Sequence, residues 1–240
     1  MKAFSITDTG RVRTSNQDQV FCEENEIGSF PNLFLVADGM GGHKAGDTAS
    51  GLCVKIVAEQ IQQSHMITPV GAFEQAIDMA NRAIYEMAKS SRELEGMGTT
   101  LVGATVMRDA ALVVNIGDSR LYKLGDSLKQ ITVDHSLVEE MVQSGEIQKE
   151  EMRTHPNKNI ITRALGTDTS VRPDCFEIDV RQGDVLLLCS DGLSNMLDDI
   201  QIETILHKYS DDIETAGKEL VSQANEAGGK DNISVVLIQI

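Results

Sequence analysis

Four apolar segments of this sequence each have an aspartate at or directly beside one end, and these residues are Asp38, Asp118, Asp191 and Asp231. Short apolar runs bounded by glycine and polar residues are typical of buried strands. Carboxylates carried to the ends of such strands can share one pocket, but close anions repel each other strongly unless a cation lies between them. The pattern therefore predicts a divalent metal site, and with it an enzyme.

A second polar group precedes the first of these aspartates. Arg13 opens the segment Arg13-Thr14-Ser15-Asn16-Gln17-Asp18, and its planar guanidinium suits bidentate contact with phosphate oxygens. Glycines after Asp38, beginning with Gly39, let the backbone turn tightly, so a carbonyl could join the carboxylate as a metal ligand. A ligand set of carboxylate, carbonyl and water favours Mn²⁺ or Mg²⁺ over softer metals.

Further motifs follow in order, namely Gly96-Met97-Gly98-Thr99-Thr100, Gly117-Asp118-Ser119-Arg120, Ser190-Asp191-Gly192 and Gly228-Gly229-Lys230-Asp231-Asn232. One Asp-Gly pair is a common turn former, but five motifs in a fixed order are specific. Together they closely resemble the PP2C-like (PPM) family of metal-dependent Ser/Thr protein phosphatases, in its compact bacterial form. The resemblance runs from Thr7-Asp8-Thr9-Gly10 to the last apolar segment.

The resemblance implies a metal centre with two ions and a third, weaker one. By analogy with the family, Asp38 would bridge the two ions, and the carbonyl of Gly39 would ligate one of them. Asp191 and Asp231 would complete the other site. Asp118 would hold the third ion together with Asp191.

The resemblance also implies the reaction. A water that bridges the metals would attack the phosphorus of phosphoserine or phosphothreonine, so Arg13, Asp18 and Asp38 are the expected catalytic residues. Arg13 would hold the phosphate, and Asp18 would orient water from the outer shell. Many eukaryotic members have a histidine directly after the Asp-Gly pair, whereas this chain has Met40. His43 or water at the third site could supply the proton instead, and the general acid stays open.

The expected partners are phosphorylated proteins and a cognate eukaryotic-like Ser/Thr kinase. Two alternatives stay open from the sequence. One is a phosphoesterase for small phosphate esters. The other is a catalytically silent homologue that serves as a regulatory or binding module, although the complete set of acidic residues argues against it.

Composition narrows the classes of partner and compartment. The net charge of −16 opposes binding to nucleic acid, because the phosphate backbone is also negative. No apolar stretch approaches the roughly 20 residues of a membrane helix, and the N-terminus starts no signal peptide. The four cysteines show no zinc-binding spacing. We expect a cytoplasmic monomer that does not bind membranes.

The hydrophobic pattern predicts the elements that must position these residues. Helical periodicity predicts two long helices over 45–63 and from 69, and two more over 199–208 and 211–227. Strand-like runs are 3–8, 19–24, 33–37, 100–107, 111–117, 120–124, 128–132, 174–180, 185–190 and 233–240. Short connections favour antiparallel pairing. The predicted class is α+β, a single domain over residues 1–240 built as a four-layer α-β-β-α sandwich.

Residues 136–165 stand apart from this pattern as a polar segment with two short amphipathic helices, around 136–144 and 148–154. We interpret it as a flap-like insertion beside the active site, which could select protein substrates. Arg163 closes the segment and is expected to anchor it to a nearby carboxylate. Arg120 is expected to pair between strands, and His135 to hydrogen-bond locally.

Overall fold

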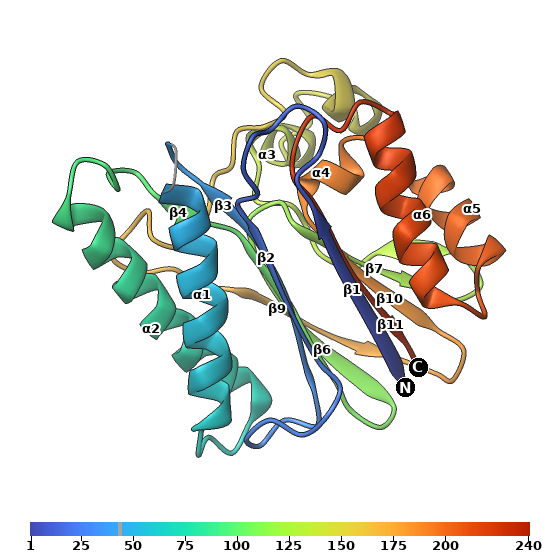
Figure 1. Ribbon diagram of the computed structural model, residues 1–240, viewed down its shortest axis with the longest axis horizontal. Coiled ribbons are helices and arrows are strands. Elements are labelled where there is room, and N and C mark those ends of the chain that lie inside the picture. The colour runs from blue at the N-terminus through green and yellow to red at the C-terminus, as the bar shows by residue number, and fades with distance from the viewer. Residues whose placement is uncertain (43–44) are drawn as a thin grey trace.

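The computed structural model describes residues 1–42 and 45–240, and two antiparallel sheets lie face to face between two pairs of helices (Figure 1). This is the predicted α-β-β-α sandwich. The first sheet has the strand order β1-β11-β10-β7-β8. Its strands are β1 (Lys2–Asp8), β11 (Ile233–Gln239), β10 (Val185–Cys189), β7 (Arg120–Leu124) and β8 (Leu128–Gln130).

The second sheet has the order β2-β3-β5-β6-β9, and the short β4 pairs with the end of β3. These strands are β2 (Asp18–Glu23), β3 (Leu33–Met40), β4 (Gly98–Thr99), β5 (Leu101–Val106), β6 (Ala110–Ile116) and β9 (Asp174–Asp179). Each neighbouring pair is antiparallel. The tight β5–β6 connection is the hairpin that the sequence predicts.

Each sheet has a helical layer on its outer face (Figure 1). The helices α1 (Ala45–Gln62) and α2 (Pro69–Ser90) cover the second sheet and share one apolar core with it. Thr68 caps α2, since its hydroxyl accepts from the backbone N–H of Gly71 at 3.2 Å, and Pro69 starts the first turn. The helices α5 (Asp199–Lys208) and α6 (Ile213–Glu226) cover the first sheet.

A third apolar core lies between the two sheets. Buried side chains from both inner faces meet there, among them Phe34, Val36, Val102, Leu188 and Val236. Because strand side chains alternate between faces, the other residues of the same strands pack outward against the helices. Two packed faces on every central strand explain why their sequences are apolar almost throughout. The strand ends are thereby held in fixed positions.

Two short elements escape sequence prediction. The helix α4 (Asp191–Ser194) begins at the residue that we expected to lie at a strand end, and β4 has only two residues. The second predicted helix of the insertion is a 3-10 helix, η1 (Lys149–Thr154), which follows α3 (Leu137–Gln143). Among the described residues, no helix is both long and apolar enough to cross a membrane.

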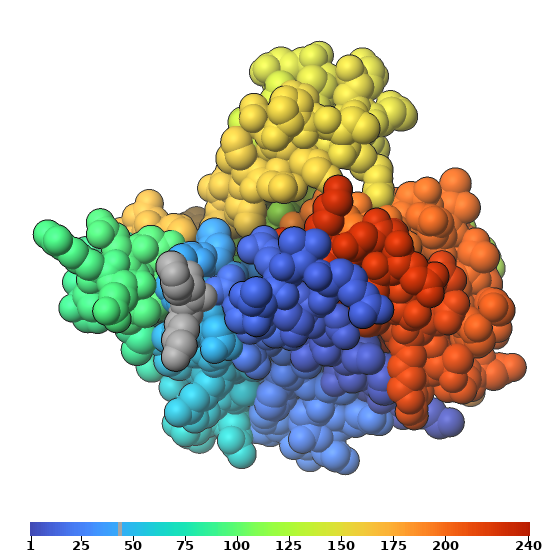
Figure 2. Space-filling view, turned by 45° about the horizontal axis from the view of Figure 1, so that its top comes forward, coloured from blue at the N-terminus to red at the C-terminus, as the bar shows by residue number. Residues whose placement is uncertain are grey.

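The segment 136–165, here called the flap, forms a separate lobe above the sheets, in yellow in Figure 2. It has little core of its own, since Val138 is the one buried residue of α3 and η1 has none. Its two ends pair with each other through a bridge between Ser136 and Ile161, and a bridge between Leu165 and Thr99 joins it to the body. The Arg163 guanidinium lies 2.6 Å from the Asp174 carboxylate, which confirms the predicted anchor.

Candidate active site

Strand pairing brings the first two acidic residues of the site together. In the β2–β3 register Asp18 lies opposite Asp38. The backbone of Asp38 is held by the threonines of the Gly-Thr-Thr motif: its N–H donates to the Thr100 hydroxyl at 2.9 Å, and its carbonyl accepts from the Thr100 N–H and the Thr99 hydroxyl. The Thr100 hydroxyl also contacts that of Ser119 at 2.7 Å. The motif therefore links Asp38 to the segment that carries Asp118.

Gly39 is required at its position by close backbone contact. A Cβ built there would lie 2.0 Å from the carbonyl oxygen of Gly46 and 2.7 Å from that of Gln17. The Gly39 N–H donates to the Gln17 carbonyl at 3.0 Å. The end of β3 is thus pressed between the first turn of α1 and the residue that precedes β2. Any larger residue would move Asp38.

Asp191 and Asp231 are joined by a second close contact between backbones. Asp191 is the first residue of α4, and a Cβ on the next residue, Gly192, would lie only 1.9 Å from the carbonyl oxygen of Asn232. The Ser190 N–H donates to the Ser234 carbonyl at 3.1 Å. The glycine of the Ser-Asp-Gly motif therefore allows the α4 turn to lie against the Asp231 loop.

The Asn232 side chain holds the loop between β1 and β2, which carries Arg13, against the Asp231 loop. Its side-chain oxygen accepts from the Gln17 N–H at 2.8 Å, and its amide donates to the carbonyls of Thr9 and Ser15 at 2.9 Å each. One side chain thus fixes three points of the segment between β1 and β2. Asn232 lies in the Gly-Gly-Lys-Asp-Asn motif, but its residue type alone does not indicate this role.

Arg13 leans across from this loop and pairs with Asp231, at 2.7 Å between Nη2 and Oδ2. The pair is open to solvent, with 51 % of the Arg13 and 34 % of the Asp231 side chain exposed. The hydrogen bond to Asp231 raises the pKa of the guanidinium, and the charges of Asp38 and Asp191 act in the same direction. Arg13 therefore stands at the rim of the acidic pocket, within reach of an anion.

Asp18 lies deepest, with 2 % of its surface exposed. Its Oδ2 accepts from the Ser190 hydroxyl at 2.7 Å. Burial raises its pKa to about 7, and the charges of Asp191 and Asp231 add to that shift. Burial and the charge of Asp231 likewise raise the pKa of Asp191 to about 6.

The pocket as a whole carries unbalanced negative charge. Burial raises the pKa of Asp38 well above its usual range, as do the four carboxylates of Asp18, Asp191, Asp118 and Asp231 around it. Within residues 1–42 and 45–240, one buried oxygen each of Asp18, Asp118 and Asp191 has no hydrogen-bond partner. Buried acceptors without donors are unfavourable, and a cation would satisfy them.

The carboxylates do not form a closed cage. No three acidic, histidine or cysteine side chains of the described chain converge closely enough to hold an ion by themselves. Mg²⁺ keeps several water ligands and is commonly bound through only one or two carboxylates, and Mn²⁺ shares its preference for oxygen. An open cluster of carboxylates with unsatisfied oxygens therefore fits a hydrated divalent cation.

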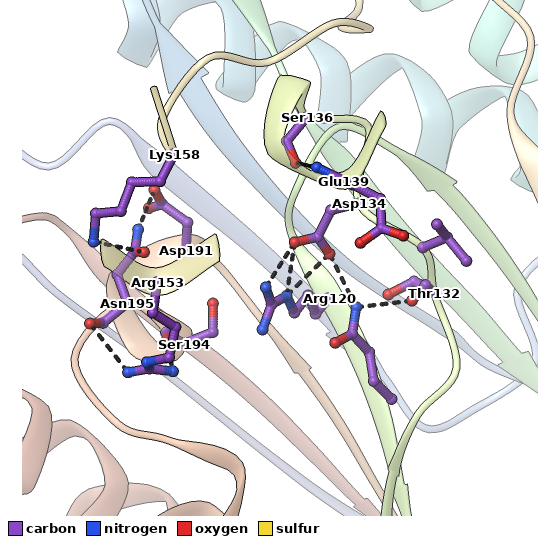
Figure 3. A network of polar contacts seen from close by, with 12 residues as sticks. Arg120, Thr132, Asp134, Ser136, Glu139, Arg153, Lys158, Asp191, Ser194 and Asn195 are labelled. Carbon is purple, nitrogen blue, oxygen red and sulfur yellow. Dashed lines mark hydrogen bonds and ion pairs between the residues drawn. The ribbon is translucent and has the colours of Figure 1, made fainter. Parts of the chain in front are cut away.

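The flap forms one wall of the site (Figure 3). The Asn195 amide donates to Asp191 at 2.9 Å and accepts from Lys158 of the flap at 3.4 Å. Arg153 donates to the carbonyls of Ser194 and Leu197 at 3.0 and 3.3 Å, at the C-terminal end of α4. A pocket of about 40 Å³, lined by Asp118 and Asp191 among others, lies beneath these contacts.

Two residues near the flap have structural roles. His135 hydrogen-bonds locally as predicted, whereas Arg120 pairs with Asp134 of the segment after β8 and not between strands. Arg120 binds both oxygens of Asp134 at 2.7–3.0 Å (Figure 3). It also donates to the Tyr122 hydroxyl at 2.8 Å. His135 accepts from the Gly117 N–H at 3.0 Å, and burial lowers its pKa. Asp134 is the ion-pair partner of Arg120.

Comparison with known proteins identifies the family. The sequence profile described as "Protein phosphatase 2C" matches residues 9–236. The chain belongs to the protein phosphatase 2C family. Its similarity to the serine/threonine phosphatase Stp of Listeria welshimeri is 40 % identity, over 100 % of this chain and 96 % of that protein.

Solved structures of the family have the same fold. The serine/threonine phosphatase of S. agalactiae superposes with a TM-score of 0.92 at 34 % identity, over 100 % of this chain and 99 % of that one. The catalytic domain of the phosphatase PstP, solved with two manganese ions, superposes with a TM-score of 0.85 at 34 % identity, over 98 % and 96 %. The predicted family, fold and enzyme class, a protein serine/threonine phosphatase, are confirmed.

The structure brings together Arg13 and all of the acidic residues that the sequence singles out. It adds the residues that hold them, which are Thr99, Thr100, Ser190, Asn195 and Asn232. Four of these lie within the motifs, and Asn195 follows Gly192 of the Ser-Asp-Gly motif by three residues. Met40 ends β3, whereas the proposed proton donor His43 lies outside the described residues.

Proposed function

We propose that this protein removes phosphate from phosphoserine and phosphothreonine in other proteins with the help of two divalent cations, Mn²⁺ or Mg²⁺. The observation that carries the proposal is the cluster of buried carboxylates around Asp38, whose unpaired oxygens need a cation. The manganese ions in the related PstP domain support the choice of metal. The serine/threonine phosphatases among its relatives support the choice of substrate.

Each residue then has a role. Asp38 would bridge two ions, with the Gly39 carbonyl as a ligand of one, and Asp191 and Asp231 as ligands of the other. Asp118 would share a third, weaker ion with Asp191. When bound, the cations supply a deprotonated water at neutral pH and neutralise charge on the phosphoryl oxygens.

The chain's own residues prepare the substrate. Arg13 would exchange its contact with Asp231 for the phosphate, which presents two oxygens to the guanidinium fork. Asp18, held by Ser190, would accept hydrogen bonds from water in the outer shell. Positioning and charge neutralisation, not a side-chain nucleophile, would lower the barrier, as is general for phosphoryl transfer.

Replacing the central carboxylate tests the proposal. We expect Asp38→Asn to lower kcat/KM for p-nitrophenyl phosphate in Mn²⁺ by about 10³-fold or more, since a charge that binds the cation is lost. Asp211→Asn, a matched change at an exposed residue, should leave the rate unchanged. Activity that persists in Asp38→Asn, or in the wild type with excess chelator, would contradict the metal mechanism. Comparison of phosphopeptides with metabolite esters tests the substrate class.

A cognate kinase, a monomeric state and a cytoplasmic location stay predictions from the sequence. So does the assignment of residues 1–240 to one domain with a flap.

A further inference from the structure

A groove of about 670 Å³ lies between the flap and the body, and Arg153 is one of its lining residues. Its walls are the segment after β8, the flap helices α3 and η1, and the start of α5. We propose that this groove binds an extended, Lys- or Arg-bearing segment of the phosphoprotein substrate, beside the phosphorylated residue. The inference rests on the proposed function and gives it a substrate preference.

The groove is continuous with the active site. Arg120, Asp134 and Arg153 line the groove, and they also line the small pocket that contains Asp118 and Asp191. The Arg120–Asp134 ion pair is largely buried, so this common wall is a fixed part of the body. A chain that enters the groove therefore lies next to the pocket that contains Asp118 and Asp191, two of the candidate metal ligands.

Apolar side chains are exposed in the groove. Ile200, in the first turn of α5, is 76 % exposed, and Val133 is 38 % exposed. Val142 and Met152 of the flap face the same space. Lysine and arginine bury their aliphatic stems on such surfaces while the charged heads stay in water. These apolar side chains could thus pack against the aliphatic stem of a lysine or arginine.

The charge of the groove also favours a segment that carries lysine or arginine. Five carboxylates and three cationic side chains line it. Arg120 is bound to Asp134, and Arg153 donates to backbone carbonyls, so two of the cations are already engaged. Besides Lys149, the remaining lining is acidic, and its carboxylates are Glu139, Glu150, Asp198 and Asp199. Asp198 caps α5 and Asp199 accepts from the Tyr122 hydroxyl, but both keep their negative charge. Complementary charge both steers a basic partner and disfavours an acidic one.

The edge of the first sheet favours an extended segment. In the described chain β8 is an edge strand that pairs only with β7, and residues 130–134 continue from it along the groove. An edge strand offers backbone groups to which an extended peptide can add. The occupant is therefore expected to lie as a strand with alternate side chains toward α5 and the flap.

The test compares three phosphothreonine peptides whose flanking residues are basic, neutral or acidic. In wild-type protein with Mn²⁺ we expect kcat/KM to be highest for the basic peptide, and the preference to shrink in high salt. The double variant Glu139→Gln/Glu150→Gln should lower kcat/KM for the basic peptide by roughly five-fold, mainly through KM, since each exposed pair contributes modestly. Hydrolysis of p-nitrophenyl phosphate should not change.

Glu140→Gln/Glu146→Gln is the matched control, since it removes the same charge from the flap outside the groove. Ile200→Ser should weaken both basic and neutral peptides by two- to three-fold. Equal rates for the three peptides, or equal losses in the control, would overturn the proposal. So would self-association in ultracentrifugation that the Glu139→Gln/Glu150→Gln change abolishes, because a second copy would then occupy the groove.

A binding measurement separates this inference from the proposed function. Fluorescence anisotropy of a labelled, unphosphorylated basic peptide needs no catalysis. Tighter binding to wild type than to Glu139→Gln/Glu150→Gln would support the groove even if no phosphopeptide were hydrolysed. No difference in binding, combined with normal hydrolysis, would reject the groove and leave the phosphatase assignment intact.

Discussion

The acidic pocket and the flap lie side by side but are built in opposite ways. The pocket is assembled from strand ends and tight turns, and backbone contacts near Gly39 and Gly192 leave no space for a side chain. The flap has almost no buried residues in its helices, and long side chains such as Arg153, Lys158 and Arg163 hold it to the body. Close backbone contacts thus hold the candidate metal ligands in place. The flap, in contrast, is positioned by long side chains that can change conformation.

The largest effect should come from disturbing the backbone contact at α4. Gly192→Ala would place a Cβ 1.9 Å from the Asn232 carbonyl oxygen, so the Asp191 and Asp231 loops must move apart. We expect loss of most phosphatase activity and destabilisation by about 3 kcal/mol, as for other severe steric changes. Gly51→Ala is the matched control, because a Cβ there meets nothing within 4 Å and helical glycine is unfavourable. Equal Tm values for the two variants would refute the steric argument.

A second effect follows from the charge of the pocket. The folded pKa of Asp18, about 7, and of Asp191, about 6, lie above the value near 3.9 of an unfolded aspartate. Their protonated forms therefore favour the folded state at low pH. That stability is lost as pH rises through the folded pKa values.

Metal-free protein should thus lose several degrees of Tm between pH 5 and pH 8. Mn²⁺ should reverse the loss, because cation binding to the folded state stabilises it. Thermal melts in chelator and in Mn²⁺ measure both effects. If the Tm of the protein in chelator rises between pH 5 and pH 8, the raised pKa values of Asp18 and Asp191 in the folded state are contradicted.

A smaller effect is expected on the flap side. Arg153→Ala removes the donor that satisfies carbonyls at the end of α4, so the flap should be cut faster by a protease. Hydrolysis of p-nitrophenyl phosphate should fall by no more than about three-fold, because the backbone around Asp38 is untouched. Arg108→Ala, in the exposed turn between β5 and β6, is the control. Protease resistance equal to wild type would show that other contacts hold the flap.

Much of the fold could be predicted because its signals are local. Helical periodicity placed α5 at its observed bounds, and Pro69 marked the start of α2. Neither α4 nor β4 is long enough to show a period, and both lie at the site. The α4 turn depends on contacts with Asn232, which is distant in sequence, so no window along the chain could reveal it.

The sequence alone could identify the residues of the site, but it could not predict which of them contact each other. Glycine and aspartate in ordered motifs identified Asp38 and Asp191, whereas the strand register that pairs Asp18 with Asp38 depends on the whole sheet. The pairing of Arg13 with Asp231 spans nearly the entire chain. Asn232 fixes the Arg13 loop through three hydrogen bonds, but it carries no charge. Its residue type therefore does not distinguish it from the other asparagines of the sequence.

The first and last strands of the protein are neighbours, with Lys2 opposite Gln239 in the β1–β11 pair. During synthesis β1 therefore has no β11 to pair with until residues 233–239 have left the ribosome. Asn232, just before β11, is also the residue that fixes the loop carrying Arg13. The strands of the second sheet are thus all made before Asp231 and Asn232, and the acidic pocket can close only after these two residues have been made. A nascent chain that still lacks Asp231 and Asn232 therefore has an incomplete active site.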